Sequence, residues 1–313
     1  MGAGLVYIGN SGGEFGGRGF VSAYKADTGE LAWRFYTTPG DPAKPDGAAS
    51  DKVMAELVQK TWPGKHNEYR GGGNVWNAIV FDPEFEQVYL ATGNGYPWAR
   101  TARSEGKGDN LFIDSVVALD AKTGAYRWHY QETPGDIWDY DSIADMILTD
   151  LPIGGAPRKV LMHTPKNGFF YVLDRKSGEL LSAEPYVAGI TWAKGIDKKT
   201  GRPIENPLAR FDERKTPTVV SPGEGGGHSW APTAFSPPSA TPQLRVRQGS
   251  GQHRRVPLRD ARTDRTGAEA GSDAAEAPVL PAGLGSGREQ GGLEDPGHGQ
   301  RGDGDSGRPG LPG

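Results

Sequence analysis

The chain has no cysteine among its 313 residues. This absence excludes a disulfide, a thiolate metal site and covalent attachment of haem through a CxxCH motif. The cysteine content therefore carries no information on the redox compartment in which the protein works.

Long apolar runs are missing too. No stretch of about 18 apolar residues occurs, so we expect no transmembrane helix. The opening stretch MGAGLVYIGN lacks the charged n-region and the long apolar h-region of a signal peptide, so we expect no export signal in it. The net charge of −4, with both signs interspersed, argues against a dedicated nucleic-acid surface.

Aromatic residues are absent from the last part of the chain, since all of them precede Ser236. From residue 238 onward the sequence consists mainly of Arg, Gly, Ala, Asp and Pro without periodicity. Such a segment has too little apolar surface to offset its chain entropy. We therefore predict an ordered domain over residues 1–237 and a low-complexity, disordered tail over 238–313, and we interpret the change as a reading-frame shift near Pro237.

The ordered part is organised by a repeat. One phrase occurs three times, as VSAYKADTGELAWRF from Val21, VVALDAKTGAYRWHY from Val116 and, more weakly, FYVLDRKSGELLSAEPY from Phe170. Each copy is predicted to be a β-hairpin with a glycine of positive φ in its turn. These glycines are Gly29, Gly124 and Gly178. The second strand carries Trp33 or Trp128 in the first two copies, and we expect each indole to pack against a neighbouring unit.

A further strand pair precedes each hairpin, although only VYIGN remains of it in the first unit. Four antiparallel strands per unit make a propeller blade, so we predict an all-β fold with about three blades in residues 1–237. Residues 37–73 are an insertion between the first two blades, and loops of that length usually have a function.

The polar loop residues are predicted to share one face of this propeller. The loop between a blade's second and third strands lies on the same face as the link to the next blade. Such loops contain Glu14, Asn94, Lys166 and Asn167, and the link between the second and third blades contains Asp139. We expect these side chains to converge at one end of the axis, where a propeller binds its ligand.

Six motifs follow one another in residues 3–237: GNSGGEFGGRG, GGGNVWNA, ATGNGYPW, TPGDIWDYDS, TPKNGFFYVLDR and GGHSWAPTAF. In combination they resemble the pyrroloquinoline-quinone (PQQ)-dependent alcohol dehydrogenases, which are periplasmic bacterial quinoproteins, and in particular their soluble and quinohaem branch. The resemblance implies an eight-bladed β-propeller of four-stranded, W-shaped blades with PQQ and a metal on its axis. It also implies that this chain is a partial propeller, truncated at both ends, from a periplasmic protein.

The same resemblance assigns roles to individual residues. It implies metal ligands at Glu14 and Asn94 and a catalytic base at Asp139. Trp76 matches the indole beneath the planar cofactor, and Lys166 matches the cation beside the quinone oxygens. The other residues in segments that contact the cofactor are Gly12, Gly13, Asn74, Asn167 and Trp230.

These residue types suit alcohol oxidation. A hard cation held by the oxygens of Glu14 and Asn94 polarises a quinone as a Lewis acid. A carboxylate beside it, here Asp139, takes the hydroxyl proton as general base. An indole stacks on a flat ring system, and an ammonium group stabilises negative charge on a reduced quinone. Two positions depart from the family pattern, because Asn74 stands where Thr is frequent and Ser229 where Asn often precedes the tryptophan.

Asp141 leaves two interpretations open. In an extended segment residues i and i+2 point the same way, so Asp139 and Asp141 could reach one ion. Alternatively, Asp141 is a cap or turn acid before SIADMI. A second aspartate at this offset resembles the lanthanide-using members of the family, but members that use calcium read this way too, so Ca²⁺ and a lanthanide ion are held equally possible.

Three hypotheses for function remain at this stage. In the first, the chain is a fragment of an enzyme that oxidises an alcohol to the aldehyde and passes electrons to a cytochrome c or quinone acceptor, and the fragment itself is inactive. In the second, it is a non-catalytic propeller scaffold of the outer-membrane-assembly type. In the third, it is the inactive product of a damaged gene.

Overall fold

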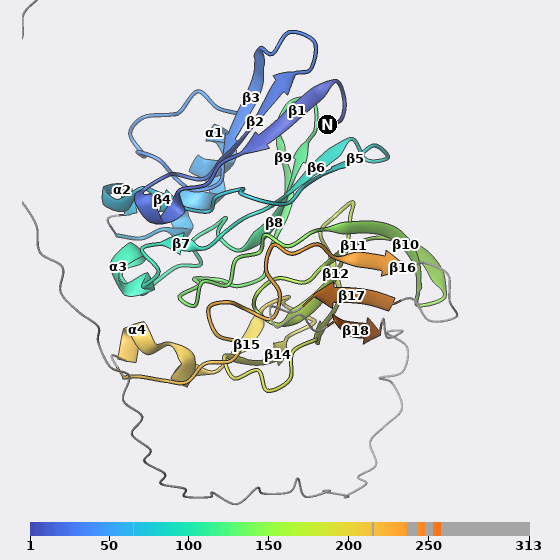
Figure 1. Ribbon diagram of the computed structural model, residues 1–313. Helices are drawn as coiled ribbons and strands as arrows, with labels where there is room; N and C mark the ends of the chain where they lie inside the picture. Colours follow the sequence, from blue (N-terminus) through green and yellow to red (C-terminus); the bar gives the residue numbers. More distant parts are fainter. Residues whose placement is uncertain (65, 215, 237–242, 248–252, 258–313) are drawn as a thin grey trace, which may run out of the picture. The chain divides into compact units, whose positions relative to one another are not determined.

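The computed structural model describes residues 1–64, 66–214, 216–236, 243–247 and 253–257 (Figure 1). All of them belong to the first of two compact units, Met1–Thr266. Within these residues, none of the helices has the length and the apolar character that crossing a bilayer requires.

Three antiparallel sheets follow one another along the chain in simple up-and-down order (Figure 1). The first has the order β1 (Leu5–Gly9), β2 (Phe20–Lys25) and β3 (Leu31–Tyr36). The second has the order β5 (Ile79–Asp82), β6 (Gln87–Ala91), β8 (Ser115–Asp120) and β9 (Tyr126–Gln131). The third has the order β10 (Ile147–Ile153), β11 (Ala156–His163), β12 (Phe169–Asp174) and β13 (Leu180–Pro185). The predicted all-β fold with four-stranded antiparallel blades is confirmed, and we refer to these sheets as blades one, two and three.

The three repeated hairpins share the same irregularity. The register shifts between Ala23 and Tyr24 in blade one, between Ala118 and Leu119 in blade two, and between Val172 and Leu173 in blade three. In every case the shift lies next to a turn closed by a glycine of positive φ. A bulge adds local twist to a hairpin, so the repeated phrase encodes the same twist in each blade.

Tryptophan and glycine join consecutive blades. A Cβ atom added to Gly124 of blade two would lie 2.6 Å from Cδ2 of Trp33 in blade one. A Cβ atom added to Gly178 of blade three would lie 2.5 Å from Cε3 of Trp128 in blade two. The indoles of Trp33 and Trp128 therefore pack on the turn backbone of the following blade, as the sequence predicted.

Alternate residues of β6 face different blades. Val88 and Leu90 belong to an apolar cluster with Val21 and Phe35 of blade one. Tyr89 belongs instead to a cluster with residues of blade three, such as Leu161 and Tyr171. Because side chains alternate along a strand and both faces are covered, the strand is apolar at every position from 88 to 91.

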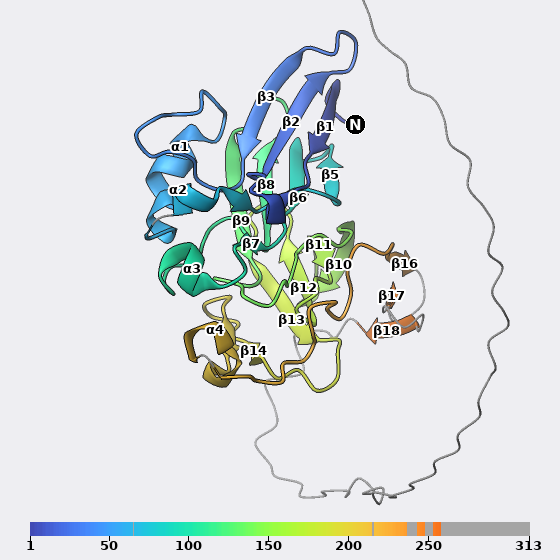
Figure 2. The ribbon, with the colours of Figure 1, turned by 60° about the vertical axis from the view of Figure 1, so that its left-hand side comes forward.

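The insertion between blades one and two packs against them. It contains α1 (Asp51–Val53), a π-helical turn (Met54–Val58), a 3₁₀ turn (Gln59–Thr61), α2 (His66–Tyr69) and β4 (Gly71–Gly72). Val53, Val58 and Trp62 are buried in the cluster shared by blades one and two. β4 pairs with β7 (Gly95–Tyr96), which precedes α3 (Arg100–Ser104) in the long loop between β6 and β8. Figures 1 and 2 both show α2 and α3 on the side of the molecule where β7 lies.

The chain after blade three forms β14 (Ala193–Ile196), β15 (Pro203–Glu205), a 3₁₀ turn (Pro207–Ala209) and α4 (Phe211–Arg214). A three-stranded sheet follows, of β16 (Ala234–Ser236), β17 (Gln243–Arg247) and β18 (His253–Pro257). The last two strands lie within the stretch after residue 238 that the sequence analysis assigned to the low-complexity tail. The sequence QLRVR alternates polar and apolar residues, which is the period of a strand, and it pairs with both neighbours. The rest of the predicted tail lies outside the described residues.

The contacts between tryptophan and turn glycine generate a stability prediction. Gly124→Ala and Gly178→Ala should each lower the free energy of unfolding by about 1 to 2 kcal/mol, because alanine is strained in the left-handed backbone conformation. Overpacking of the new methyl group against the indole should lower it by a further amount of about 1 to 3 kcal/mol. Gly29→Ala is the matched control, because Gly29 has φ of 73° but no atom within 4 Å of its added Cβ, so only the first loss applies. Urea unfolding of the three variants measures the difference, and equal losses at all three positions would contradict the packing argument.

Candidate active site

Loops of blades one and two and the link between blades two and three meet at a cavity of about 190 Å³. Its lining consists of Ser11 and of most of the residues predicted from the sequence: Gly12, Gly13, Glu14, Asn74, Trp76, Asn94, Asp139 and Asp141. They come from the β1–β2 loop, the segment after β4, the β6–β8 loop and the link between blades two and three. The predicted convergence of these loops on one face is therefore seen in the structure.

The β1–β2 loop is held against the segment after β4 by Asn74. Its Nδ2 donates to the carbonyl oxygens of Ser11 and Gly17, both at 3.2 Å. A Cβ atom on Gly13 would lie 2.5 Å from Oδ1 of Asn74, so a side chain at position 13 would displace the carboxamide of Asn74. Glu14 lies in a 3₁₀ turn at the tip of this loop with its side chain exposed. Asn74 thus fixes the loop that presents Glu14 to the cavity.

Asp141 organises the opposite side of the cavity. Its Oδ1 accepts hydrogen bonds from the backbone N–H of Asn94 at 3.0 Å and from the indole Nε1 of Trp76 at 3.4 Å. A Cβ atom on Gly93 would lie 2.6 Å from the same oxygen. Asp141 itself is 4% exposed, whereas Trp76 is 39% exposed and leaves part of its ring surface open.

Lys166 joins the two aspartates of the link. Its Nζ lies 2.8 Å from Oδ2 of Asp139 and 2.7 Å from Oδ2 of Asp141. The lysine is 8% exposed. Burial by itself lowers the pKa of Lys166, but the charges of Asp141 and Asp139 outweigh it and hold the pKa above its ordinary value. Lys166 is therefore a fixed positive charge at this site.

Asp139 has the pKa of a general base that works near neutrality. Burial, followed by the charge of Asp141, raises its pKa to about 7, although the ion pair with Lys166 opposes this shift. Its backbone has φ of 65°, and its N–H donates at 3.1 Å to Oδ2 of Asp136. Oδ1 of Asp136 accepts the N–H of Trp138 at 3.0 Å. Asp136, which the sequence analysis did not single out, thus shapes the turn that presents Asp139.

A second residue missed by the sequence analysis is Asp114, in the β6–β8 loop. It is fully buried, and neither of its carboxylate oxygens has a hydrogen-bond partner among the described residues. Burial, then the charges of Asp136 and Asp141, raise its pKa well above the ordinary value. Nothing in the sequence distinguishes it from other loop aspartates, because only the fold brings it near the acids of the link.

The loop that carries Lys166 and the link that carries Asp139 are tied together at their bases. His163, the last residue of β11, places Nδ1 at 2.9 and 3.1 Å from the carboxylate oxygens of Glu132, the first residue after β9. Its Nε2 donates to the carbonyl oxygen of Ala144 at 3.1 Å. Both side chains are fully buried. These contacts of His163 join the start of the β11–β12 loop to both Glu132 and Ala144 of the link.

Two predicted cofactor-contacting residues are placed elsewhere. The side chain of Asn167 is fully buried, where its Nδ2 donates to Glu132 O, Thr133 Oγ1 and Tyr171 OH. It braces the Lys166 loop and does not line the cavity. Trp230 is 63% exposed and does not line the cavity either. Its motif contacts the start of the Lys166 loop through His228, whose Nδ1 lies 3.0 Å from the carbonyl oxygen of Thr164.

The donor set at the cavity suits a hard cation. Glu14, Asn94, Asp139 and Asp141 all offer oxygen atoms, the ligands that Ca²⁺ and similar ions prefer. The two aspartates already hold one cationic group, the ammonium of Lys166. Within the described residues, however, no three acidic or histidine side chains gather closely enough to form a metal cluster. The residues fit a cation in chemistry and in their shared cavity, while the present side-chain positions direct both aspartates to Lys166.

Comparisons with known proteins show similarity over most of the described chain. Residues 6–183 match the PQQ-containing family described as glucose/ethanol/alcohol dehydrogenase, β-propeller domain. The dehydrogenase subunit of alcohol dehydrogenase (quinone) from Komagataeibacter europaeus is 51% identical over 236 residues, which are 75% of this chain and 32% of that protein. The chain therefore spans about a third of the length of this curated relative.

The fold is also similar to solved structures of alcohol dehydrogenases. The quinohemoprotein alcohol dehydrogenase from Comamonas testosteroni aligns with a TM-score of 0.73 at 46% identity, over 82% of this chain and 36% of that chain. A europium-containing methanol dehydrogenase aligns with a TM-score of 0.67 at 35% identity, over 79% of this chain and 43% of that chain.

The buried carboxyl of Asp114 generates a prediction on pH dependence. Its folded-state pKa is raised, so between the ordinary value and the raised value the folded protein binds more protons than the unfolded chain, and stability falls as pH rises through that window. The loss is up to about 1.4 kcal/mol per pH unit. Asn resembles the neutral carboxyl, so Asp114→Asn should raise the free energy of unfolding more at about pH 8 than at about pH 5.

Asp109→Asn is the control of opposite sign. The hydrogen bonds from Arg202 lower the pKa of Asp109. The ionised carboxylate therefore stabilises the folded protein above its ordinary pKa, and this stabilisation is lost as pH falls. This variant should therefore lose stability at neutral pH. Urea unfolding at the two pH values measures both variants, and an Asp114→Asn protein that is destabilised equally at both would show the argument to be wrong.

Proposed function

Since the chain belongs to the family of PQQ-dependent alcohol dehydrogenases, we propose that its cavity is part of a site for PQQ and a hard cation. The whole protein then oxidises an alcohol to the aldehyde and passes electrons to a cytochrome c or quinone acceptor. We also propose a periplasmic location, as the family resemblance implies. The observation that carries the proposal is the ion pair of Asp139 with Lys166 at the cavity lined by Glu14, Trp76 and Asn94.

PQQ, when bound, supplies the two-electron acceptor that alcohol oxidation requires. Asp139 removes the proton of the substrate hydroxyl, for which a pKa of about 7 is well suited, because the base is then both ionised and strong enough near neutrality. Lys166 keeps a positive charge beside the reacting atoms and stabilises negative charge that develops there. The open part of the Trp76 ring offers a flat surface for stacking.

Glu14 and Asn94 are the proposed cation ligands. Glu14 is exposed on its loop, where no hydrogen bond described in the structure restrains its carboxylate. Asn94 is held in place through its backbone, since its N–H donates to Asp141 and its carbonyl oxygen accepts from Gly73 N. A propeller scaffold that only binds proteins has no need of a buried lysine between two carboxylates, so this cluster favours the enzyme.

The role of Asp139 is tested in the full-length protein that contains these residues, reconstituted with PQQ and CaCl₂. Asp139→Ala should lower the rate of dye reduction by a primary alcohol by a factor of about 10² to 10⁴, because the general base is lost. Asp145→Ala is a control, since that aspartate lies on the same link but does not line the cavity. Turnover by Asp139→Ala at the rate of the unchanged protein would rule out its role as base.

The identity of the cation is tested with the chain itself. Trp76 lines the cavity, so its indole should sensitise the luminescence of Tb³⁺ bound there. If Asp141 is a ligand of a trivalent ion, Asp141→Ala should weaken Tb³⁺ binding more than it weakens competition by Ca²⁺, because the higher charge gains more from one further carboxylate. Equal weakening for the two ions, or none for either, would favour a calcium site that Asp141 only borders. Trp76→Phe identifies the luminescence that arises at this cavity.

A further inference from the structure

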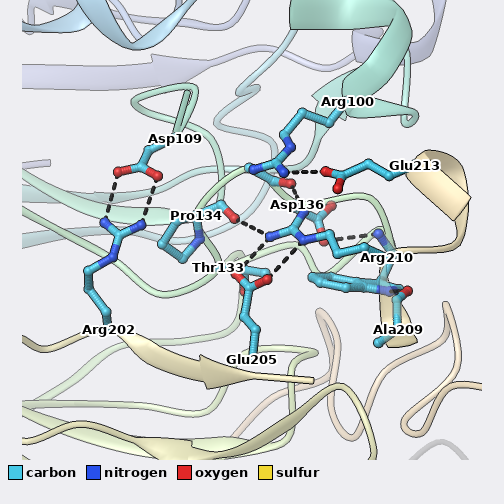
Figure 3. Close-up of polar contacts among 12 residues, drawn as sticks. Arg100, Asp109, Thr133, Pro134, Asp136, Arg202, Glu205, Ala209, Arg210 and Glu213 are labelled. Atoms are coloured by element: carbon cyan, nitrogen blue, oxygen red, sulfur yellow. Dashed lines mark hydrogen bonds and ion pairs between the residues drawn. The ribbon is translucent and has the colours of Figure 1, made fainter. Parts of the chain in front are cut away.

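The segment after blade three is fastened to the loops of blade two by polar contacts (Figure 3). Arg202 forms a two-point ion pair with Asp109, with both nitrogen to oxygen distances at 2.8 Å. Arg100 of α3 pairs with Glu213 of α4, and the N–H of Thr101 donates to Asp212 at 3.1 Å. These contacts bring the stretch 193–214 next to the link that carries Asp139.

Arg210 is the buried centre of this interface. It is 6% exposed. Its Nε and Nη2 donate to the two carboxylate oxygens of Glu205 at 2.8 and 2.7 Å. Its Nη2 also donates to the carbonyl oxygen of Pro134 at 3.0 Å, and its Nη1 donates to that of Gly135 (Figure 3). Glu205 thus orients the guanidinium, whose remaining donors hold the backbone of the link.

The same guanidinium stacks on the link. The Cζ of Arg210 lies 4.6 Å from the ring centroid of Trp138, the residue before Asp139. The Nε1 of Trp138 donates to the carbonyl oxygen of Ala209, next to Arg210, at 3.0 Å. Tyr140, the residue after Asp139, stacks on Trp138 with a centroid distance of 5.5 Å. Arg210 therefore contacts the residue before Asp139 directly, and the residue after Asp139 packs on the same indole.

Arg103 holds the link from blade two. Its Nη2 donates to the carbonyl oxygen of Asp136 at 2.7 Å, and its Nη1 donates to that of Pro97 at 2.6 Å. Burial lowers the pKa of Arg103 to about 10, so it remains charged near neutral pH. Arg103 and Arg210 together hold the carbonyl oxygens of three consecutive residues, 134 to 136.

We propose that Arg210 is a positioning residue for Asp139. By holding Pro134 and Gly135 and covering Trp138, it fixes the turn from which Asp139 reaches Lys166. The effect on catalysis rests on the proposed function. There, a small displacement of Asp139 would misalign the base with the proton of the substrate hydroxyl. A lysine cannot replace it, since only the planar fork of arginine meets a carboxylate and two carbonyl groups while it stacks on an indole.

The proposal is tested first on the chain without cofactor. The rate at which sulfosuccinimidyl acetate modifies Lys166, relative to the exposed Lys25, is measured by peptide mass spectrometry. In the unchanged protein Lys166 should react slowly, because it is buried and paired with two carboxylates. Arg210→Gln should raise the relative rate severalfold as Asp139 leaves Lys166, and Arg210→Lys should restore it only in part.

Arg202→Gln is the matched control. It removes an arginine of the same segment that pairs with a carboxylate of blade two but does not touch the link. It should lower the melting temperature without changing the relative rate at Lys166. If Arg210→Gln leaves the rate unchanged, or if Arg202→Gln raises it equally, Arg210 is only a structural residue and the proposal is overturned. Should Arg210→Gln not fold, Glu205→Gln, which removes the partner that orients the guanidinium, takes its place.

The full-length protein reconstituted with PQQ and CaCl₂ gives the second readout. Arg210→Gln should lower kcat severalfold with little change in KM for the alcohol, while Arg202→Gln leaves kcat unchanged. A loss confined to KM, or an equal loss in both variants, contradicts the positioning role. If the unchanged protein oxidises no alcohol, the proposed function fails, and the reactivity of Lys166 still decides whether Arg210 positions Asp139.

Discussion

The ammonium of Lys166 between Asp139 and Asp141 is the interaction on which the geometry of the site depends. Both carboxylates lie on one short link, separated by a single residue, and they are largely shielded from water. Two buried like charges at such a spacing repel each other strongly unless a counter-charge lies between them. Lys166 comes from the next blade, so the ion pairs also bind the β11–β12 loop to the link.

The remaining acids near the link are accommodated in different ways. Asp136 accepts two backbone N–H groups, which turn the chain so that Asp139 takes a φ of 65°. Asp114 has no hydrogen-bond partner in the part of the chain that the structure describes, and its raised pKa favours the neutral form. Glu132 is paired with His163 at the base of the link. The link is thus fixed at its beginning and at its turn. This restricts the orientation of the Asp139 side chain.

Sequence analysis predicted the parts of the fold that depend on local patterns. The period of two, the turn glycines and the repeated phrase were sufficient to place the hairpins of all three blades. The packing of Trp33 and Trp128 on neighbouring units also followed, because an indole on an edge strand must be covered. Asn167 and Trp230 do not line the cavity, since a motif shows that a segment approaches a site but not which way a side chain points. Strands β17 and β18 were missed because the composition around them is otherwise typical of disorder.

The sequence by itself determined which loops meet at one face and which oxygen-bearing and cationic residues they contain, because strand order in a blade dictates the face on which each loop lies. Only the tertiary structure decided how those side chains are paired. Asp114, Glu132, His163 and Arg210 are unremarkable as single letters, and each acquires its role from a partner more than ten residues away or from burial. Such contacts depend on the packing of one blade against the next, and no local period encodes them.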